Sequence, residues 1–338
     1  MTTVAVIGAG AWGTALAVLA SRRGHDVRLW VRRPDLATAI DAGRENSTYL
    51  PGIKLDPAIT VSADSARIGD AAMVLSVLPV QHTRSVLRIL ASQIAADATL
   101  VICSKGIEIA SGDLLSTVIA EALPGRPVAV LTGPTFADEV ARGQPSAVTV
   151  ACADHAIGQF IVTALGDASF RPYYTDDVIG AQVGGAVKNV LAIACGIAAG
   201  RRFGENARAA LITRGLAEIG RLSAALGGRP ETLMGLSGLG DVALSCTSAQ
   251  SRNFALGRAL GEGAALSTIL QNRTTVAEGA PSAAAIAALA AHHAIDMPIV
   301  AAVDAILHKD AGVDDTVRSL LTRPFRAESD AGVNAKPR

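Results

Sequence analysis

The first 175 residues alternate short apolar, β-branched runs with stretches of helical character. Nearly continuous apolar strands separated by helices are typical of a mostly parallel sheet with helices on both faces and right-handed crossovers. Ligands of such sheets bind beyond the carboxyl ends of the strands. The pattern therefore predicts an α/β, doubly wound first domain. The expected strands are Thr3–Ile7, Asp26–Val31, Ala58–Ser62, Met73–Val77, Leu100–Ser104, Val128–Leu131 and Ala147–Ala151.

The second half of the chain has a different pattern. From Val178 onward the β-branched runs disappear, and stretches rich in Ala, Leu and Gly indicate an all-helical domain. A chain of 338 residues, half of them hydrophobic, is long enough for two cores. We therefore expect a first domain at 1–180, a helical domain at 181–330 and a flexible tail at 331–338.

Charge and cysteine usage narrow the range of partners. The formal net charge is zero, so no long-range field attracts nucleic acid or an anionic membrane, and the expected partner is a small molecule. The four cysteines are widely spaced, without the paired pattern of a metal site and without the framework of a disulfide-rich domain. We expect no metal and a cytoplasmic location. The apolar N-terminus lacks the basic start of a signal peptide.

A glycine triplet follows the first expected strand. Gly8, Gly10 and Gly13 stand in the segment GAGAWG, between an apolar strand and a helix. Glycine permits a tight turn and close approach of the backbone, and a helix N-terminus offers free N–H groups to a pyrophosphate. In this context the triplet predicts a Rossmann-type dinucleotide site, whereas a ligand-free tight turn is the alternative.

The end of the second expected strand suggests which dinucleotide is bound. An NAD-selective site holds an acidic residue there, but this chain has Arg32 and Arg33. Paired arginines suit a 2′-phosphate, so either NADP(H) or NAD(H) is expected, with NADPH slightly favoured. Two solvated surface arginines are the alternative.

Lysine is scarce, with five residues against 25 arginines. Lys105 directly follows an expected strand, at the ligand-binding edge of the sheet. Lys188 is the only charged residue in Val178–Ala199, which as a helix is about 30 Å long. A lysine at the centre of a membrane span would cost about 3 kcal/mol. A buried helix that presents one titratable amine to a cleft is therefore favoured over a membrane span.

The segment 235–241, GLSGLGD, predicts a loop that approaches another group closely. Asp241 would be a lone carboxylate at its end, able to hold an amine or a substrate hydroxyl. Arg252 and Asn253 fall at the start of an expected helix, Phe254–Leu260, where guanidinium, amide and N–H groups can converge on one phosphate. A surface charge is the alternative for Arg252.

Together these segments resemble the bacterial-type NAD(P)-dependent glycerol-3-phosphate dehydrogenases over nearly the whole chain. The strings that carry the resemblance are GAGAWGTALA at the start, Asn46–Leu50 with Pro51, SKGIE at 104–108, GPTFADEV at 133–140, GGAVKNVLAIACGI at 184–197, ALITRGLAEI at 210–219, GLSGLGD at 235–241, SRNFALG at 251–257 and VAEG at 276–279.

The resemblance implies reduction of dihydroxyacetone phosphate to sn-glycerol 3-phosphate, which supplies glycerophospholipid synthesis. It implies that Lys188 is the general acid and that Asp241 holds the substrate and the amine. The implied substrate residues are Lys105, Gly133, Thr135, Lys188, Asp241, Ser251, Arg252 and Asn253. The implied cofactor residues are Gly8, Gly10, Ala11, Trp12, Gly13, Arg32, Arg33, Tyr49, Lys105, Ala137, Arg252, Val276 and Glu278. A homodimer is a candidate assembly.

Three departures from the family pattern concern the cofactor rather than the reaction. Ala11 stands where relatives often carry serine, Gln182 stands where an acidic residue is common, and Glu205 in the segment Phe203–Asn206 is the longer acid. Two alternatives remain open: a β-hydroxyacid or 6-phosphogluconate-type dehydrogenase, which also combines a dinucleotide domain with helices and a lysine, and a non-catalytic protein that senses NADPH.

Overall fold

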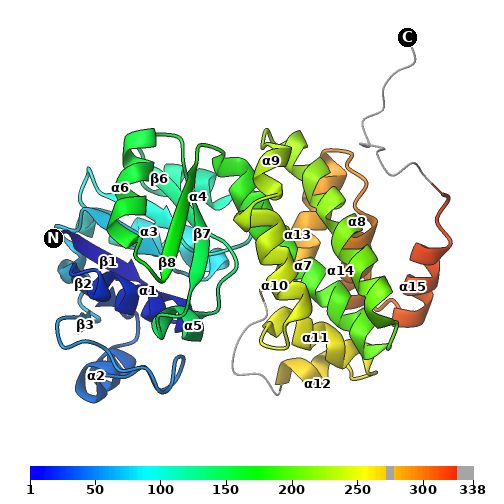
Figure 1. Ribbon diagram of the computed structural model, residues 1–338, viewed down its shortest axis with the longest axis horizontal. Coiled ribbons are helices and arrows are strands. Elements are labelled where there is room, and N and C mark those ends of the chain that lie inside the picture. The colour runs from blue at the N-terminus through cyan, green and yellow to red at the C-terminus, as the bar shows by residue number, and fades with distance from the viewer. Residues whose placement is uncertain (272–277, 326–338) are drawn as a thin grey trace, which may run out of the picture. The chain divides into compact units, whose positions relative to one another are not determined.

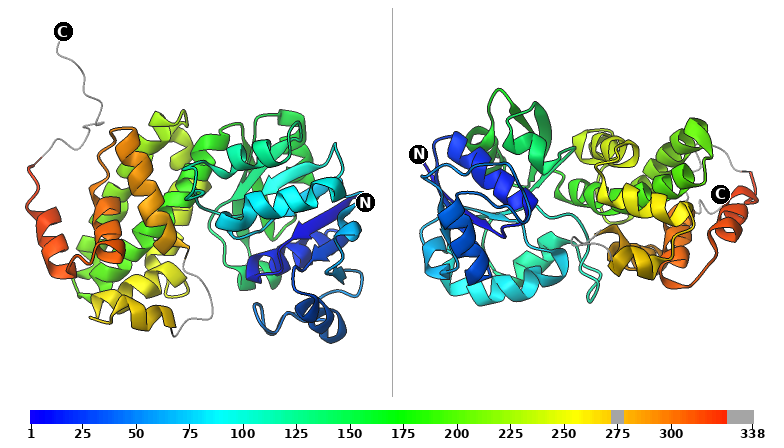
Figure 2. Two further views of the ribbon diagram at one scale, coloured as in Figure 1. Left: turned by 180° about the vertical axis from the view of Figure 1, so that it is seen from behind. Right: turned by 90° about the horizontal axis from the view of Figure 1, so that it is seen from below.

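The computed structural model describes residues 1–271 and 278–325. It divides into two compact units, which Figures 1 and 2 show in three views. The first contains Met1–Glu108 and Asp113–Gln182, and the second contains Ile109–Gly112 and the chain from Val183 onward.

The described residues of the first unit form one sheet of eight strands in the order β3-β2-β1-β4-β5-β6-β7-β8. Neighbouring strands are parallel except β6 and β7, which pair antiparallel with Val130 opposite Ala151. The strands are β1 (Thr3–Ile7), β2 (Asp26–Trp30), β3 (Thr60–Ser62), β4 (Met73–Ser76), β5 (Thr99–Ile102), β6 (Val128–Thr132), β7 (Ser146–Cys152) and β8 (Phe170–Thr175). From β1 the strands are added toward one edge of the sheet as far as β3, and from β4 onward they are added toward the other edge. Such folds bind ligands at the point between β1 and β4 where this order changes.

Helices cover both faces of this sheet, as predicted. Alternate residues of β1 point to opposite faces: Val4 and Val6 pack in one core cluster, Ala5 and Ile7 in the other. The first face is covered by α1 (Ala11–Arg22), α2 (Pro34–Gly43) and α6 (His155–Leu165), the second by α3 (Thr83–Leu90) and α4 (Leu115–Ala122). The short elements are η1 (Ser65–Ile68), η2 (Val80–His82), η3 (Ala91–Gln93) and α5 (Ala137–Ala141). The doubly wound α/β fold is confirmed.

One strand was missed by the sequence analysis. Strand β8 lies at the edge of the sheet and contains Pro172, which lacks the N–H group that a central strand must donate. An edge strand has a side without ladder partners, so proline is tolerated there. The mixture of exposed and buried residues in FRPYYT also hides the apolar run that marks the other strands.

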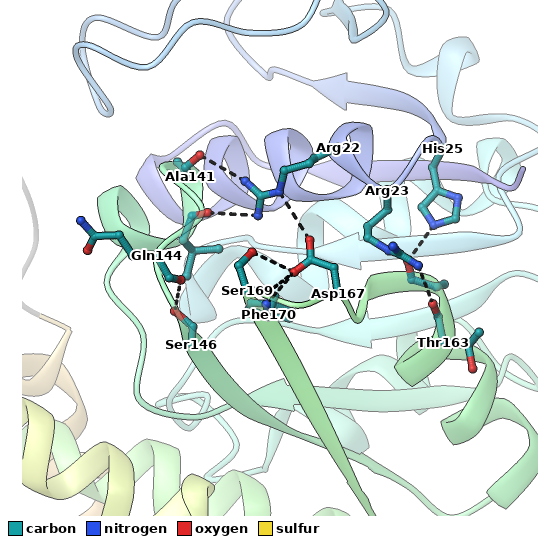
Figure 3. Close-up of polar contacts among 12 residues, drawn as sticks. Arg22, Arg23, His25, Ala141, Gln144, Ser146, Thr163, Asp167, Ser169 and Phe170 are labelled. Carbon is teal, nitrogen blue, oxygen red and sulfur yellow. Dashed lines mark hydrogen bonds and ion pairs between the residues drawn. The ribbon is translucent and has the colours of Figure 1, made fainter.

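The end of α1 is tied to the chain around β7 and β8 by polar contacts (Figure 3). The guanidinium of Arg22 donates to the carbonyl oxygens of Val140 and Ala141 and forms an ion pair with Asp167. Asp167 in turn accepts hydrogen bonds from the backbone N–H groups of Ser169 and Phe170. These contacts fix the position of the helix that begins at the glycine turn.

The second unit is helical over its described residues, as predicted. Its central helix is α7 (Val178–Gly200), whose first residues belong to the first unit. The others are α8 (Gly204–Ala225), α9 (Pro230–Leu233), the π-helix η4 (Leu236–Gly240), α10 (Asp241–Thr247), α11 (Arg252–Gly261), α12 (Leu266–Gln271), α13 (Gly279–His292), α14 (Pro298–His308) and α15 (Val313–Leu321).

Helix α7 is the one described helix that is long and apolar enough to cross a membrane. Its most apolar window is 83% buried within the protein. A buried core helix can be as long and as apolar as a membrane span, and the burial of α7 is that of a core helix. The prediction that this helix is buried is confirmed.

Helices α7 and α11 touch backbone to backbone. A Cβ atom at Gly257 would lie 2.0 Å from the carbonyl oxygen of Ile193, and one at Gly196 would lie 2.1 Å from that of Phe254. Both distances are far below van der Waals contact, so only glycine fits. The close packing locks α11 against the helix that carries Lys188.

A buried carboxylate caps another helix of this unit. Glu218 on α8 is 1% exposed and accepts hydrogen bonds from the backbone N–H groups of Ile299 and Val300 at the start of α14. Burial raises the pKa of Glu218 to about 7, although both hydrogen bonds and the charge of Arg221 act in the opposite direction.

The raised pKa makes stability depend on pH. Protonated Glu218 favours the folded state below its unfolded pKa, and this contribution is lost as pH rises through about 7. Between pH 5.5 and 8 the wild-type protein should lose about 2 kcal/mol of unfolding free energy relative to Glu218→Gln. Denaturant unfolding at both pH values measures this difference. The exposed Glu231→Gln is the control; a parallel loss in wild type and Glu218→Gln would contradict the prediction.

Candidate functional site

The glycine turn after β1 is shaped by two glycines that no other residue can replace. Gly8 has φ +112°, and a Cβ there would lie 2.7 Å from the carbonyl oxygen of Val77. A Cβ at Gly13 would lie 1.8 Å from the carbonyl oxygen of Gly8. The turn and the first turn of α1 are thus packed against each other and against β4.

Gly10 differs from these two glycines, because a Cβ there would meet no protein atom within 4 Å. Gly10 is also the N-cap of α1 and supplies no side-chain cap. The turn therefore leaves bare backbone and helix N–H groups, which suit a pyrophosphate. These residues fit a dinucleotide, which Gly8, Gly10 and Gly13 would hold together with Ala11 and Trp12.

Asn46 stabilises this turn by hydrogen bonds. It is completely buried, and its Nδ2 donates to the carbonyl oxygen of Ala9 at 2.9 Å and to Oγ1 of Thr14 at 2.8 Å. Its Oδ1 accepts a hydrogen bond from the backbone N–H of Tyr49, one of the predicted cofactor residues. The sequence analysis used Asn46 only as part of a family string. The sequence carried no separate signal for this contact, because the partners of Asn46 lie 37 and 32 residues away.

Arg32 and Arg33 are both exposed but differ in their partners. Arg33 forms an ion pair with Asp35 at 2.6 Å, and this contact raises the pKa of its guanidinium above the usual range. In the described part of the chain no carboxylate pairs with Arg32. If a 2′-phosphate binds at this position, Arg32 is therefore the more available of the two.

Three predicted residues come together beyond the ends of β5 and β6. Nζ of Lys105 donates to the carbonyl oxygen of Gly133 at 2.9 Å, and Oγ1 of Thr135 donates to the same oxygen at 3.4 Å. Gly133 has φ +147°, and a Cβ there would lie 2.9 Å from Cα of Val148, so the position requires glycine. Ala137 begins α5 close by in sequence.

In the second unit, Lys188 and Asp241 form a buried ion pair. Nζ of Lys188 lies 2.8 Å from Oδ1 of Asp241, and the side chains are 11% and 1% exposed. The same ammonium donates to Oγ of Ser245 at 2.7 Å. Because an ammonium has three N–H donors, two of which are used here, one remains for a further acceptor. The group can therefore hold a substrate oxygen and give it a proton.

One expectation about this region needs correction, and one contact was missed. The segment 235–241 was predicted to be a loop with Asp241 at its end, but Leu236–Gly240 forms a π-helical turn and Asp241 begins α10. Here a Cβ at Gly238 would lie 2.1 Å from the carbonyl oxygen of Leu233, so the glycines serve helix packing. Ser245 was missed, although its position four residues after Asp241 places both on one helix face.

Two buried thiols lie beside the ion pair. Cys246 follows Ser245 on α10, and Cys195 lies two turns after Lys188 on α7. The pKa of the Cys246 thiol is raised well above its usual range, mainly by a hydrogen bond with Cys195 and also by burial. Both cysteines are free and completely buried. With the Cys246 thiol neutral, the charge beside it comes from the Lys188–Asp241 pair.

The remaining predicted residues cluster at the start of α11. Oγ of Ser251 accepts a hydrogen bond from the backbone N–H of Phe254 and thus caps α11, which begins at Arg252. Asn253 is buried; its Nδ2 donates to Oδ1 of Asn189, and its Oδ1 accepts from the backbone N–H of Gly279. The Asn253 side chain thus already links three helices, because Asn189 and Gly279 belong to α7 and α13.

Of the last two predicted cofactor residues, Glu278 is at the start of α13. Glu278 is its N-cap residue, and its carbonyl oxygen accepts a hydrogen bond from Oγ of Ser282. Val276 lies outside the described residues. The roles of all these residues toward substrate and cofactor stay predictions.

Comparisons of sequence and of structure relate this chain to the same family of known proteins. Residues 3–157 match the model of the NAD-dependent glycerol-3-phosphate dehydrogenase N-terminus, and residues 177–318 match the model of its C-terminus. The chain belongs to the NAD-dependent glycerol-3-phosphate dehydrogenase family. Glycerol-3-phosphate dehydrogenase [NAD(P)+] of Parvibaculum lavamentivorans is 53% identical over 96% of this chain and 98% of its own length. That of Rhodospirillum rubrum is also 53% identical, over 99% and 96%.

A solved structure of a family member matches as well. The crystal structure of glycerol-3-phosphate dehydrogenase from Coxiella burnetii covers 95% of this chain and 99% of its own, with a TM-score of 0.92 and 40% identity. D-mandelate dehydrogenase, at 13% identity and a TM-score of 0.62, shares the fold alone. The predicted resemblance to this dehydrogenase family is confirmed, as is its class of cofactor, NAD or NADP.

Proposed function

We propose that this member of the glycerol-3-phosphate dehydrogenase family interconverts dihydroxyacetone phosphate and sn-glycerol 3-phosphate in the cytoplasm. The observation that carries the proposal is the Lys188–Asp241–Ser245 group, which places one buried, hydrogen-bonded ammonium in a helical core. Reduction of a ketone needs a proton at the oxygen, and this ammonium can supply it. When bound, the nicotinamide supplies or accepts the hydride.

The residues of this group have separable tasks. Asp241 balances the charge of the Lys188 ammonium, which would be costly to bury alone, and with Ser245 fixes the direction of its remaining N–H group. Lys188 then gives its proton to the ketone oxygen and becomes a neutral amine, which regains a proton from water. In the reverse direction the neutral amine accepts the proton of the alcohol.

A phosphate of the substrate needs its own binding groups. We assign this task to Arg252, whose guanidinium can contact two phosphate oxygens, and to the N–H groups at the start of α11, which Ser251 caps. Lys105, Gly133 and Thr135 are the corresponding candidates in the first unit. In this proposal the reduced product supplies glycerophospholipid synthesis, and the homodimer stays a prediction.

Substrate choice tests the proposal directly. Oxidation of NADPH, followed by its absorbance, should be fast with dihydroxyacetone phosphate and slow with an unphosphorylated 3-keto acid, because the latter lacks the phosphate. Activity with the keto acid alone would favour a β-hydroxyacid dehydrogenase. Cofactor binding without turnover of either compound would favour an NADPH-sensing protein.

Removing the proton donor should separate catalysis from cofactor binding. Lys188→Ala is expected to lower kcat by a factor of about 10² or more and to leave NADPH affinity nearly unchanged, because the lysine acts on the substrate oxygen. Steady-state kinetics and a fluorescence titration with NADPH measure the two effects. Lys309→Ala, at an exposed lysine of the same unit, is the matched control. Undiminished turnover in Lys188→Ala would assign the acid to another group.

The two arginines after β2 allow a test of cofactor preference. Replacing Arg32 and Arg33 together by alanine should weaken NADPH binding about tenfold more than NADH binding, since only NADPH carries the 2′-phosphate. Of the single variants, Arg32→Ala should have the larger effect, because Arg33 is paired with Asp35. Titration of both cofactors measures this, with the exposed Arg67→Ala as the control. Equal losses for the two cofactors would mean that neither arginine contacts the phosphate.

A further inference from the structure

The second unit contains a cavity that the proposed reaction does not use. Its volume is about 620 Å³, within the range of small-molecule sites. It is lined by the end of α7, the first turns of α8, the segment after α10 and one side of α11. The lining residues on which the argument rests are Arg201, Arg202, Arg208, Phe254, Arg258 and Glu262.

We propose that this cavity, which we call the arginine cavity, binds a small metabolite that carries a diphosphate group. Four arginines line it, Arg201, Arg202, Arg208 and Arg258, against one acidic residue, Glu262. Guanidinium groups bind phosphate oxygens two at a time, and four of them exceed the need of one phosphate. The volume likewise leaves room for more than a single phosphate.

The arginines of the cavity are available to such a ligand. In the described part of the chain no carboxylate pairs with Arg202. The other three form ion pairs with Asp314, Glu205 and Glu262, whose side chains are 69%, 77% and 51% exposed. Ion pairs with such exposed carboxylates contribute little to stability. A diphosphate can therefore replace these carboxylates at small cost and gain several charge-assisted hydrogen bonds.

One wall of the cavity is apolar. Phe254 is buried, and with Ala199 and Ala249 it offers a surface for the uncharged part of the ligand. Behind it the helices are in backbone contact, since a Cβ at Gly200 would lie 2.4 Å from the carbonyl oxygen of Arg258. The backbone of this wall is therefore closely packed, and the rearrangement that binding requires is confined to the side chains of the ion pairs.

The arginine cavity is separate from the lysine group. Ala199 lies eleven residues after Lys188 on α7, which corresponds to about 16 Å along the helix. The same helices nevertheless serve both places. Helix α10 carries Asp241 and ends at Thr247 in the cavity, and α11 begins at Arg252 and continues to Arg258 in the cavity. A ligand here would contact the helices that carry Lys188, Asp241 and Arg252.

Calorimetric titration with inorganic pyrophosphate tests the proposal. The intact protein should show saturable binding, and the double variant Arg202→Gln with Arg258→Gln should weaken it at least about tenfold, because two guanidinium groups are lost. The control is Arg171→Gln with Arg318→Gln, which removes the same charge at exposed positions elsewhere and should change binding less than twofold. Inorganic phosphate should bind at least about tenfold more weakly than pyrophosphate, since it can engage fewer guanidinium groups.

Each other outcome overturns the proposal. Absence of saturable binding removes the site, and equal weakening in both double variants reduces it to nonspecific charge attraction. Pyrophosphate binding that is unchanged in the Arg202 and Arg258 variant belongs to the substrate's phosphate site or another place. Equal affinity for phosphate and pyrophosphate rejects the diphosphate class. None of these variants replaces a residue of the proposed reaction, so turnover of dihydroxyacetone phosphate checks the proposed function independently.

Discussion

The contact between the ammonium of Lys188 and the carboxylate of Asp241 ties α7 to α10 in the core of the second unit. Each charge alone would be strongly destabilising in an apolar helical core, so the two must meet, and they can meet only if α7 and α10 keep their relative position. The hydroxyl of Ser245, also on α10, accepts a second hydrogen bond from the Lys188 ammonium. A buried ion pair of this kind is a weak source of stability. Its value lies in holding one N–H group in a defined direction, which is what proton transfer requires.

Glycine serves two opposite purposes in this protein. At Gly8 and Gly13 a side chain would collide with backbone, so glycine allows strand and helix to pack. At Gly10 a side chain would meet nothing, so the protein itself gives no reason for glycine there. The open position is the one that faces a ligand in a dinucleotide fold, and the packed positions hold its backbone in place. Asn46 adds a third constraint, because its buried amide fixes Ala9 and Thr14 on either side of Gly10.

The sequence predicted the doubly wound sheet, the helical second unit and the buried lysine helix, because these follow from apolar periodicity and from one isolated charge. It missed β8, since Pro172 and exposed residues obscure an edge strand. It mistook 235–241 for a loop, because local composition does not reveal that Gly238 packs against the backbone of Leu233. Ser245 and Asn46 were missed as contacts for a related reason: their partners lie far away in sequence. Lys188 and Ser245, for example, are 57 residues apart.

The backbone contact between α7 and α11 has a consequence for how this enzyme can change during evolution. With Gly196 and Gly257 pressed against carbonyl oxygens of the facing helix, neither helix can slide or turn without opening a gap. Any larger residue at these positions would displace the amine of Lys188 relative to the start of α11. In the proposed function, the spacing between the groups that hold the two ends of the triose is set by main-chain contacts between α7 and α11 rather than by side chains. Because the backbone contact between α7 and α11 leaves no room for adjustment, a change in the length of the substrate would have to be accommodated by changes in loops.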